Sequence, residues 1–155
     1  METTEDILIA MRSAPEIFVG LLHGITQQEA AAADMGGQEW SVIEILCHLR
    51  DVEEIALQRN QSMLENDNPV IQGYDHLALV EERNYAEGKL GEALARFLDF
   101  RTKHIALLEA LKPEEWLRRG QHTVIGEVTV FEHQVHNVGH DFNHAAQIAR
   151  HLGKV

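Results

Sequence analysis

The 155-residue chain is 45% hydrophobic and 25% charged, a balance typical of one globular domain rather than a disordered segment. Its 13 lysines and arginines stand against 25 aspartates and glutamates, and the net charge of -12 argues against nucleic acid and membrane surfaces as partners. A single cysteine, Cys47, excludes an intrachain disulfide. An acidic start and the lack of a long apolar run predict a cytoplasmic protein without a signal peptide or a membrane span.

The first half of the chain is predicted to be mainly helical, because apolar residues recur at spacings of three and four. The first predicted helix covers about 4–23, and a capping-box sequence at 13–16 suggests that it restarts there. Another capping box opens a short helical turn at Thr26. The next long helix begins after Ser41, a good N-cap, and ends near Leu64.

The second half follows the same pattern. Residues 70–87 have room for one short helix, and a third long helix covers about 88–111. A brief extended segment is predicted over 124–128, and a capping box opens a fourth long helix over 129–152. No repeat or linker divides the chain, so the sequence predicts an all-α four-helix bundle that forms a single domain over residues 1–155.

Six of the ten histidines lie between residues 122 and 151, in or just before the last predicted helix. His136, His140 and His144 follow at intervals of four, so they fall within roughly an 80° arc of one helical face, together with Gln147. Imidazoles four residues apart can bind the same cation because their Cβ atoms are about 6 Å apart. Such a pair supplies half of a metal site.

The other face of this helix is apolar. Two arrangements would bury the apolar face and still give the histidines a suitable environment. In one, the apolar face packs in the bundle core and the histidines point outward. In the other, the histidines line an internal polar cleft and part of the apolar face meets a second subunit, which favours a homodimer. The apolar residues are Phe131, Val135, Val138, Phe142, Ala145, Ala149 and Leu152.

The best candidate for a further ligand on another helix is His48. It lies in the middle of the second long helix beside Ile45 and Val52, where a neutral or metal-bound imidazole is favoured over an imidazolium. Asp51 follows one turn later. It could accept the ring N–H of a ligand histidine or be an ordinary solvated carboxylate.

Two segments that contain histidines belong to different predicted long helices. One runs from Trp40-Ser41 to His48, and the other runs from His140 to His144. Other recognisable residues occur in order along the chain, namely Pro69, Tyr74-Asp75, the segment 97–101, Trp116, His122 and the segment 126–129. With these residues the chain resembles the DinB-like, or YfiT-like, family of metalloenzymes over nearly its whole length.

The resemblance implies a four-helix bundle that holds a divalent cation with three histidines, one from the second helix and two from the last. Matched position by position, these ligands are His48, His140 and His144. The histidine-rich stripe leaves His136 with His140 as an alternative pair. The remaining candidates are expected around the metal or in its pocket: Asp51, His122, His136 and Gln147.

Three neutral imidazoles leave at least one position open on the cation, as in catalytic zinc sites. Water bound there would become a nucleophile near neutral pH, and a thiol would lose its proton. Members of the resembled family include thiol-dependent S-transferases and isomerases as well as hydrolases. The resemblance therefore implies an enzyme that acts on a small molecule, first as a thiol S-transferase and alternatively as a hydrolase. Zinc or nickel and a low-molecular-weight thiol are the expected cofactors. The third alternative for the function is a non-catalytic bundle that binds a metal.

Several more residues are candidates for the approach to the metal. These are Arg59, Arg101, Trp116 and His122, although both arginines could equally be solvated charges and Trp116 a packing anchor. Cys47 points away from His48 around the helix, so it is predicted to be a buried structural thiol rather than a nucleophile.

Overall fold

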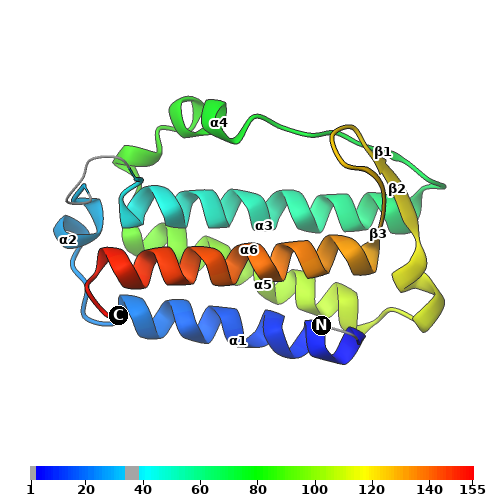
Figure 1. Ribbon diagram of the computed structural model, residues 1–155, viewed down its shortest axis with the longest axis horizontal. Helices are drawn as coiled ribbons and strands as arrows, with labels where there is room; N and C mark the ends of the chain where they lie inside the picture. Colours follow the sequence, from blue (N-terminus) through cyan, green and yellow to red (C-terminus); the bar gives the residue numbers. More distant parts are fainter. Residues whose placement is uncertain (1–2, 34–38) are drawn as a thin grey trace.

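The computed structural model describes residues 3–33 and 39–155. Four long helices lie side by side in a bundle, in which α3 packs against α5 and α6, and α1 packs against the same two helices (Figure 1). The predicted all-α four-helix bundle is therefore confirmed. The long helices are α1 (Thr4–Leu22), α3 (Val42–Glu65), α5 (Leu90–Glu109) and α6 (Val130–His151).

Capping boxes fix where three of the four bundle helices, α1, α3 and α6, begin. Ser41 accepts a hydrogen bond from the backbone N–H of Glu44, whose carboxylate accepts the N–H of Ser41 in return. Thr129 and Glu132 form the same reciprocal pair at the start of α6. The predicted short turn is also present, as α2 (Gln27–Ala31).

Helix α1 passes through Pro15 without restarting, so the predicted break at 13–16 is wrong. Proline lacks the N–H that would bond to the carbonyl four residues earlier, which is that of Met11. The buried Arg101 of α5 donates to this carbonyl oxygen instead, at 3.2 Å. The hydroxyl of Ser13 donates to the carbonyl of Ile9 at 2.8 Å rather than capping a new helix.

Helices α3 and α5 run in the same direction, left to right in Figure 1, so the chain between them returns along the length of the bundle. This crossover, residues 66–89, contains strand β1 (Val70–Ile71), helix α4 (His76–Glu82) and the 3-10 turn η1 (Tyr85–Glu87). The predicted short helix in 70–87 is confirmed. Periodicity could not reveal the crossover, because it carries no information on direction.

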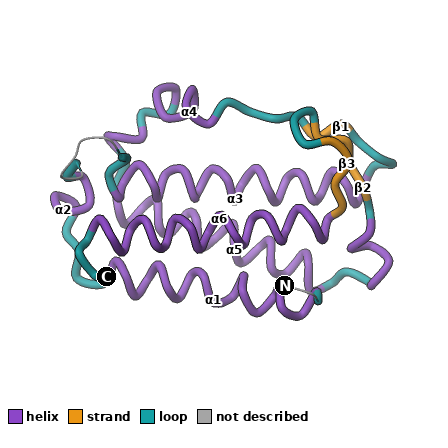
Figure 2. Tube along the Cα trace, viewed as in Figure 1, coloured by secondary structure: helices purple, strands orange, loops and turns teal. Residues whose placement is uncertain are grey.

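A small sheet closes one end of the bundle (Figure 2). After the 3-10 turn η2 (Pro113–Leu117), strand β2 (Arg119–His122) pairs antiparallel with β3 (Gly126–Thr129) and parallel with β1. Gly120 allows this close pairing, since a Cβ there would lie 2.7 Å from the side chain of Ile71. The extended segment predicted over 124–128 overlaps β3 but includes part of the turn before it.

The bundle core contains two apolar clusters with polar residues between them. One cluster, near α2, is built around Phe18 and Phe97, and the other, near the sheet, includes Met63 and Trp116. Trp116 is therefore a packing anchor and does not line the approach to the histidines. Buried polar residues lie in sequence between the two clusters on α3, α5 and α6: Glu53, Asn60, Arg101, His104 and Asp141.

Arg101 is the centre of this polar group and is only 2% exposed, so it is neither a solvated charge nor part of the approach to the histidines. Its Nε and one terminal nitrogen bind both oxygens of Glu53 at 2.9 and 2.7 Å, and that terminal nitrogen also binds Asp141 at 2.7 Å. Burial alone would raise the pKa of Glu53, but the charge of Arg101 and a hydrogen bond from His104 lower it to about 2.

The apolar face of α6 turns towards α1. Phe131, Val135 and Val138 belong to the same cluster as Ile7 and Met11 of α1. A second subunit is therefore not needed to cover these residues. The homodimer stays a prediction, and Phe142, which is 40% exposed, is the large apolar residue of this face that remains at the surface.

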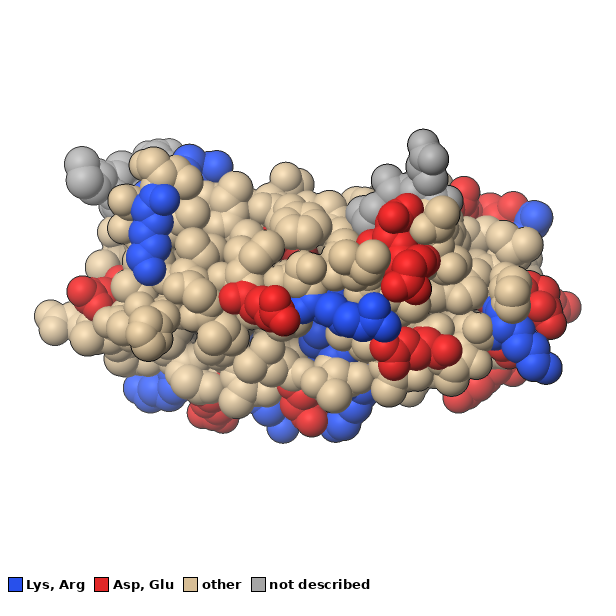
Figure 3. Space-filling model, turned by 90° about the horizontal axis from the view of Figure 1, so that it is seen from below, with Lys and Arg blue, Asp and Glu red and all other residues tan. Residues whose placement is uncertain are grey.

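Charges are mixed on the molecular face seen in Figure 3, where basic side chains lie beside acidic ones and wide uncharged areas separate them. Among the described residues, no helix is long and apolar enough to cross a membrane.

The buried ion cluster of Arg101, Glu53 and Asp141, called the Arg101 cluster below, yields the first prediction. Replacing Arg101 with Leu leaves Glu53 and Asp141 buried without their cation, so we expect the free energy of unfolding to fall by about 3–5 kcal/mol. Urea unfolding at neutral pH measures this. The matched control is Arg12→Leu, which breaks exposed ion pairs to Glu5 and Glu109 and should lower the stability far less than Arg101→Leu. Equal stability of the two variants would contradict the central role of Arg101.

Candidate metal centre

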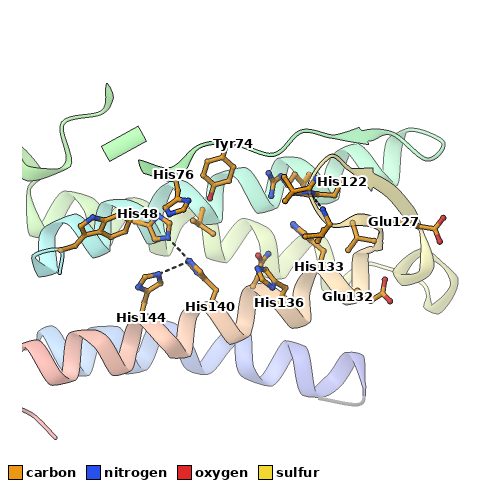
Figure 4. Close-up of a pocket in the computed structure, with 17 residues that line it drawn as sticks. His48, Tyr74, His76, His122, Glu127, Glu132, His133, His136, His140 and His144 are labelled. Carbon is orange, nitrogen blue, oxygen red and sulfur yellow. Dashed lines mark hydrogen bonds between the residues drawn. The ribbon is translucent and has the colours of Figure 1, made fainter. Parts of the chain in front are cut away.

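Three histidines from two antiparallel helices converge at one point. His48 comes from the first third of α3, while His140 and His144 lie one turn apart on α6 (Figure 4). The Nε2 atom of His140 lies 2.9 Å from Nε2 of His48 and 3.1 Å from Nε2 of His144, and the three possible ligand atoms all lie within 4.8 Å of one another. Nitrogen ligands of a tetrahedral zinc are about 3.4 Å apart, so the residues present fit a divalent metal with little rearrangement.

The environment keeps these imidazoles neutral, which is the form that binds metals. Burial, together with a smaller effect of the neighbouring imidazoles, lowers the pKa of His48 and of His140 to about 3. Burial also lowers the pKa of His144. All three therefore have lone pairs available at neutral pH.

Gln147 supports one of the three histidines. Its Oε1 lies 2.8 Å from Nδ1 of His144, so it can accept the ring N–H and leave the Nε2 lone pair directed at the convergence point. Trp40 lies against the ring of His48, with the ring centres 5.0 Å apart. These contacts hold the two rings in the orientation that a metal requires.

Asp51 has a different role from the one expected as an acceptor for a ligand histidine. Its carboxylate accepts hydrogen bonds from Arg50 at 2.7 Å, Arg83 at 2.9 Å and the hydroxyl of Tyr85 at 2.6 Å. It therefore fastens the crossover to α3. The physical reason is helical geometry, because a residue three positions after His48 is rotated about 60° away from it around the helix.

The three converging histidines open into a cavity of about 710 Å³ between α3, α6, the crossover and the sheet. Figure 4 places them at one end and His122 and His133 at the other, with Tyr74 and His76 of the crossover above. Of the expected pocket residues, His122 and His136 line this cavity, but neither joins the convergence point. Arg59 also lines it, whereas Cys47 is buried and does not.

A buried chain of hydrogen bonds leads from the Arg101 cluster to the cavity. Glu53 accepts the Nδ1–H of His104 at 2.8 Å, which leaves Nε2 of His104 to accept a hydrogen bond from the amide nitrogen of Asn60 at 2.7 Å. The oxygen of Asn60 then accepts the Nδ1–H of His133 at 3.0 Å. The chain thus fixes the tautomer of His133, whose Nε2 is left as a hydrogen-bond acceptor on the cavity wall.

The sequence did not indicate this chain of hydrogen bonds or the position of His76 in the cavity. His104 and Asn60 carry no motif, and Trp40 and Tyr74 were recognised only as residues that carry the family resemblance. The signal that could have found His104 is its spacing, because it lies on the same face of α5 as Phe97, Arg101 and Leu108, which is the buried face.

Comparison with known proteins gives two matches of different kinds. A model of the DinB superfamily matches residues 10–148. Among solved structures, YfiT from Bacillus subtilis has a TM-score of 0.87 and 20% sequence identity, with 99% of this chain and 89% of YfiT covered. YfiT is described as a probable metal-dependent hydrolase with an unusual four-helix bundle topology. At this identity the likeness shows the fold alone, and curated proteins gave no significant match.

The lowered pKa values lead to a second prediction. In water an imidazole has a pKa of about 6.5, and three such ligands would weaken zinc binding more than tenfold between about pH 7 and 6. Because the folded protein keeps His48 and His140 neutral far below that range, we expect affinity to change little over this interval and to fall at lower pH.

Competition with a chelator at several pH values measures the zinc affinity. A steep loss between pH 7 and 6 would mean that the imidazoles titrate as they do in water. Affinity that stays constant into strong acid would exclude histidine ligands altogether.

Proposed function

The chain belongs to the DinB superfamily, and on that premise we propose that it is a metal-dependent hydrolase of a small molecule, with the cation held by His48, His140 and His144. The observation that carries the proposal is the convergence of three neutral Nε2 atoms at one end of an open cavity. A closed structural site would have four protein ligands, whereas three leave a position free on the cavity side.

A divalent metal at this point would polarise a substrate carbonyl or phosphoryl oxygen and supply an activated water at neutral pH. The protein's own residues do the rest. Gln147 and Trp40 hold the ligand rings, and the apolar surface of Trp40 shields one side of the centre. His76 lies on the open side, with its ring 6.1 Å from that of His48, where it can take up or release a proton during hydrolysis.

A thiol S-transferase is the second candidate. The observation that bears on it is the position of Cys47, the only cysteine of the sequence, which is 1% exposed and outside the cavity. Burial raises the pKa of this thiol, so it is a poor nucleophile. A transferase would therefore use a low-molecular-weight thiol bound in the cavity, and added thiol would stimulate its activity.

The third prediction tests the metal ligands. His144→Ala removes one ligand and should weaken zinc binding by roughly a hundredfold or more. The matched control is His23→Ala, which changes an exposed histidine of the loop after α1 and should leave zinc binding unchanged. Elemental analysis of protein purified without a nickel column gives the occupancy, and circular dichroism checks that the helices remain.

The same variants test the reaction. Hydrolysis of small ester, amide and phosphoester substrates should disappear on chelation and in His144→Ala, and return when zinc is added back to the wild type. Full metal occupancy in a His48, His140 and His144 triple alanine variant would overturn the ligand assignment. Transfer to an added thiol without hydrolysis would favour the second candidate.

A further inference from the structure

The cavity contains a positive charge that the protein itself leaves unpaired. Arg59 is the only lysine or arginine among the described residues that line the cavity. One terminal nitrogen donates to the carbonyl oxygen of Gln72 at 2.7 Å, and the guanidinium lies 5.3 Å from the centre of the Tyr74 ring. Across the described parts of the chain, no carboxylate lies within ion-pair distance of Arg59.

An unpaired arginine is unexpected in this protein, where acidic residues outnumber basic ones by 25 to 13. Two glutamates line the same cavity, but both have other partners. Glu127 binds Arg119 at 2.8 Å, and Glu132 caps α6 through Thr129. Burial lowers the pKa of Arg59, so the guanidinium is partly desolvated and no carboxylate of the described chain compensates it.

We propose that Arg59 binds an anionic oxygen group, a carboxylate or a phosphate, at the far end of an elongated substrate whose reacting bond lies at His48, His140 and His144. This inference rests on the proposed function, because it assigns the opposite end of the same substrate. Arginine suits the task, since its planar fork can donate two parallel hydrogen bonds to such a group.

The spacing of the two ends sets the length of the substrate. Arg59 follows His48 by eleven residues on α3, which is close to three full turns, so both side chains project from nearly the same face. The helix rises roughly 16 Å over this distance, and the long arginine side chain can shorten the span. A cavity of about 710 Å³ has room for a molecule of that length.

Apolar side chains line much of the cavity. Val52 lies between His48 and Arg59 on α3, and Val124, Ile125 and Val128 line the cavity from the sheet end, while His136 and Asn137 of α6 are polar residues of the same cavity. The middle of the substrate is therefore a mainly hydrocarbon segment. A short, highly charged substrate would leave this apolar surface in contact with water, whereas a long-chain acid would cover it.

The test uses zinc-loaded protein and mercapto acids of increasing length, from 4-mercaptobutanoate, which is too short to reach Arg59 and too long to chelate zinc well through its carboxylate, to 11-mercaptoundecanoate. The thiolate binds the metal, and the carboxylate reaches Arg59 only when the chain is long enough. Calorimetry should give each long acid an affinity about tenfold or more above that of the amide of equal length, while the shortest acid gains nothing over its amide. A mercaptoalkyl phosphate of matched length shows which of the two anions is preferred.

Two substitutions test whether Arg59 causes the preference for an acid over its amide. Arg59→Gln should remove the preference for acid over amide while the affinity for mercaptoethanol, which has no anionic end, stays the same. Arg150→Gln removes an exposed charge of α6 outside the cavity and should preserve the preference. Acids and amides of equal affinity at every length, or a preference that survives in Arg59→Gln, would overturn the proposal.

A further pair of probes separates this inference from the proposed function. Octanoate and octanamide carry no group that binds zinc strongly through sulfur. If mercaptoethanol fails to bind, the metal centre is wrong, yet a preference for octanoate that depends on Arg59 would still support the anion site. If octanoate and octanamide bind equally while the thiols bind the metal, the metal centre stands and the anion site is wrong.

Discussion

The ion cluster around Arg101 is the contact on which the rest of the architecture depends, because it joins all four long helices at one level. The guanidinium belongs to α5 and binds Glu53 of α3, Asp141 of α6 and the carbonyl of Met11 on α1. Apolar side chains can slide past one another at small cost, but these bonds are directional and short. The register of the four helices is therefore defined in the middle of the core.

This register is also what brings the three converging histidines together. His140 precedes Asp141 in the sequence, and His48 lies on the same helix as Glu53, little more than one turn earlier. A shift of α6 by one turn against α3 would separate the three Nε2 atoms and break the ion cluster at the same time. The conformation of the candidate centre is thus maintained by a cluster that does not itself face the cavity.

The helices and their starts follow from the sequence, because capping boxes and apolar spacing are local properties. The histidine spacing, together with the family resemblance, was enough to select His48, His140 and His144. The role of Arg101 could not be predicted in this way. A charged residue is expected at the surface unless its partners are known, and those partners lie on three other helices. Arg59 was recognised only as one possible cavity residue, since a sequence does not show that a charge lacks a counterion.

The segment that covers the cavity is separate from the helices that carry the three converging histidines. Residues 66–89 cover the cavity and supply Tyr74 and His76, yet α4 within them buries none of its residues. Changes at the exposed positions of α4 cost little folding energy and leave the histidine-bearing helices untouched, whereas the buried Ile71 and Tyr85 anchor the rest of the crossover. The covering of the cavity can therefore diverge between related proteins at the exposed positions of α4, while the three converging histidines and the ion cluster stay unchanged.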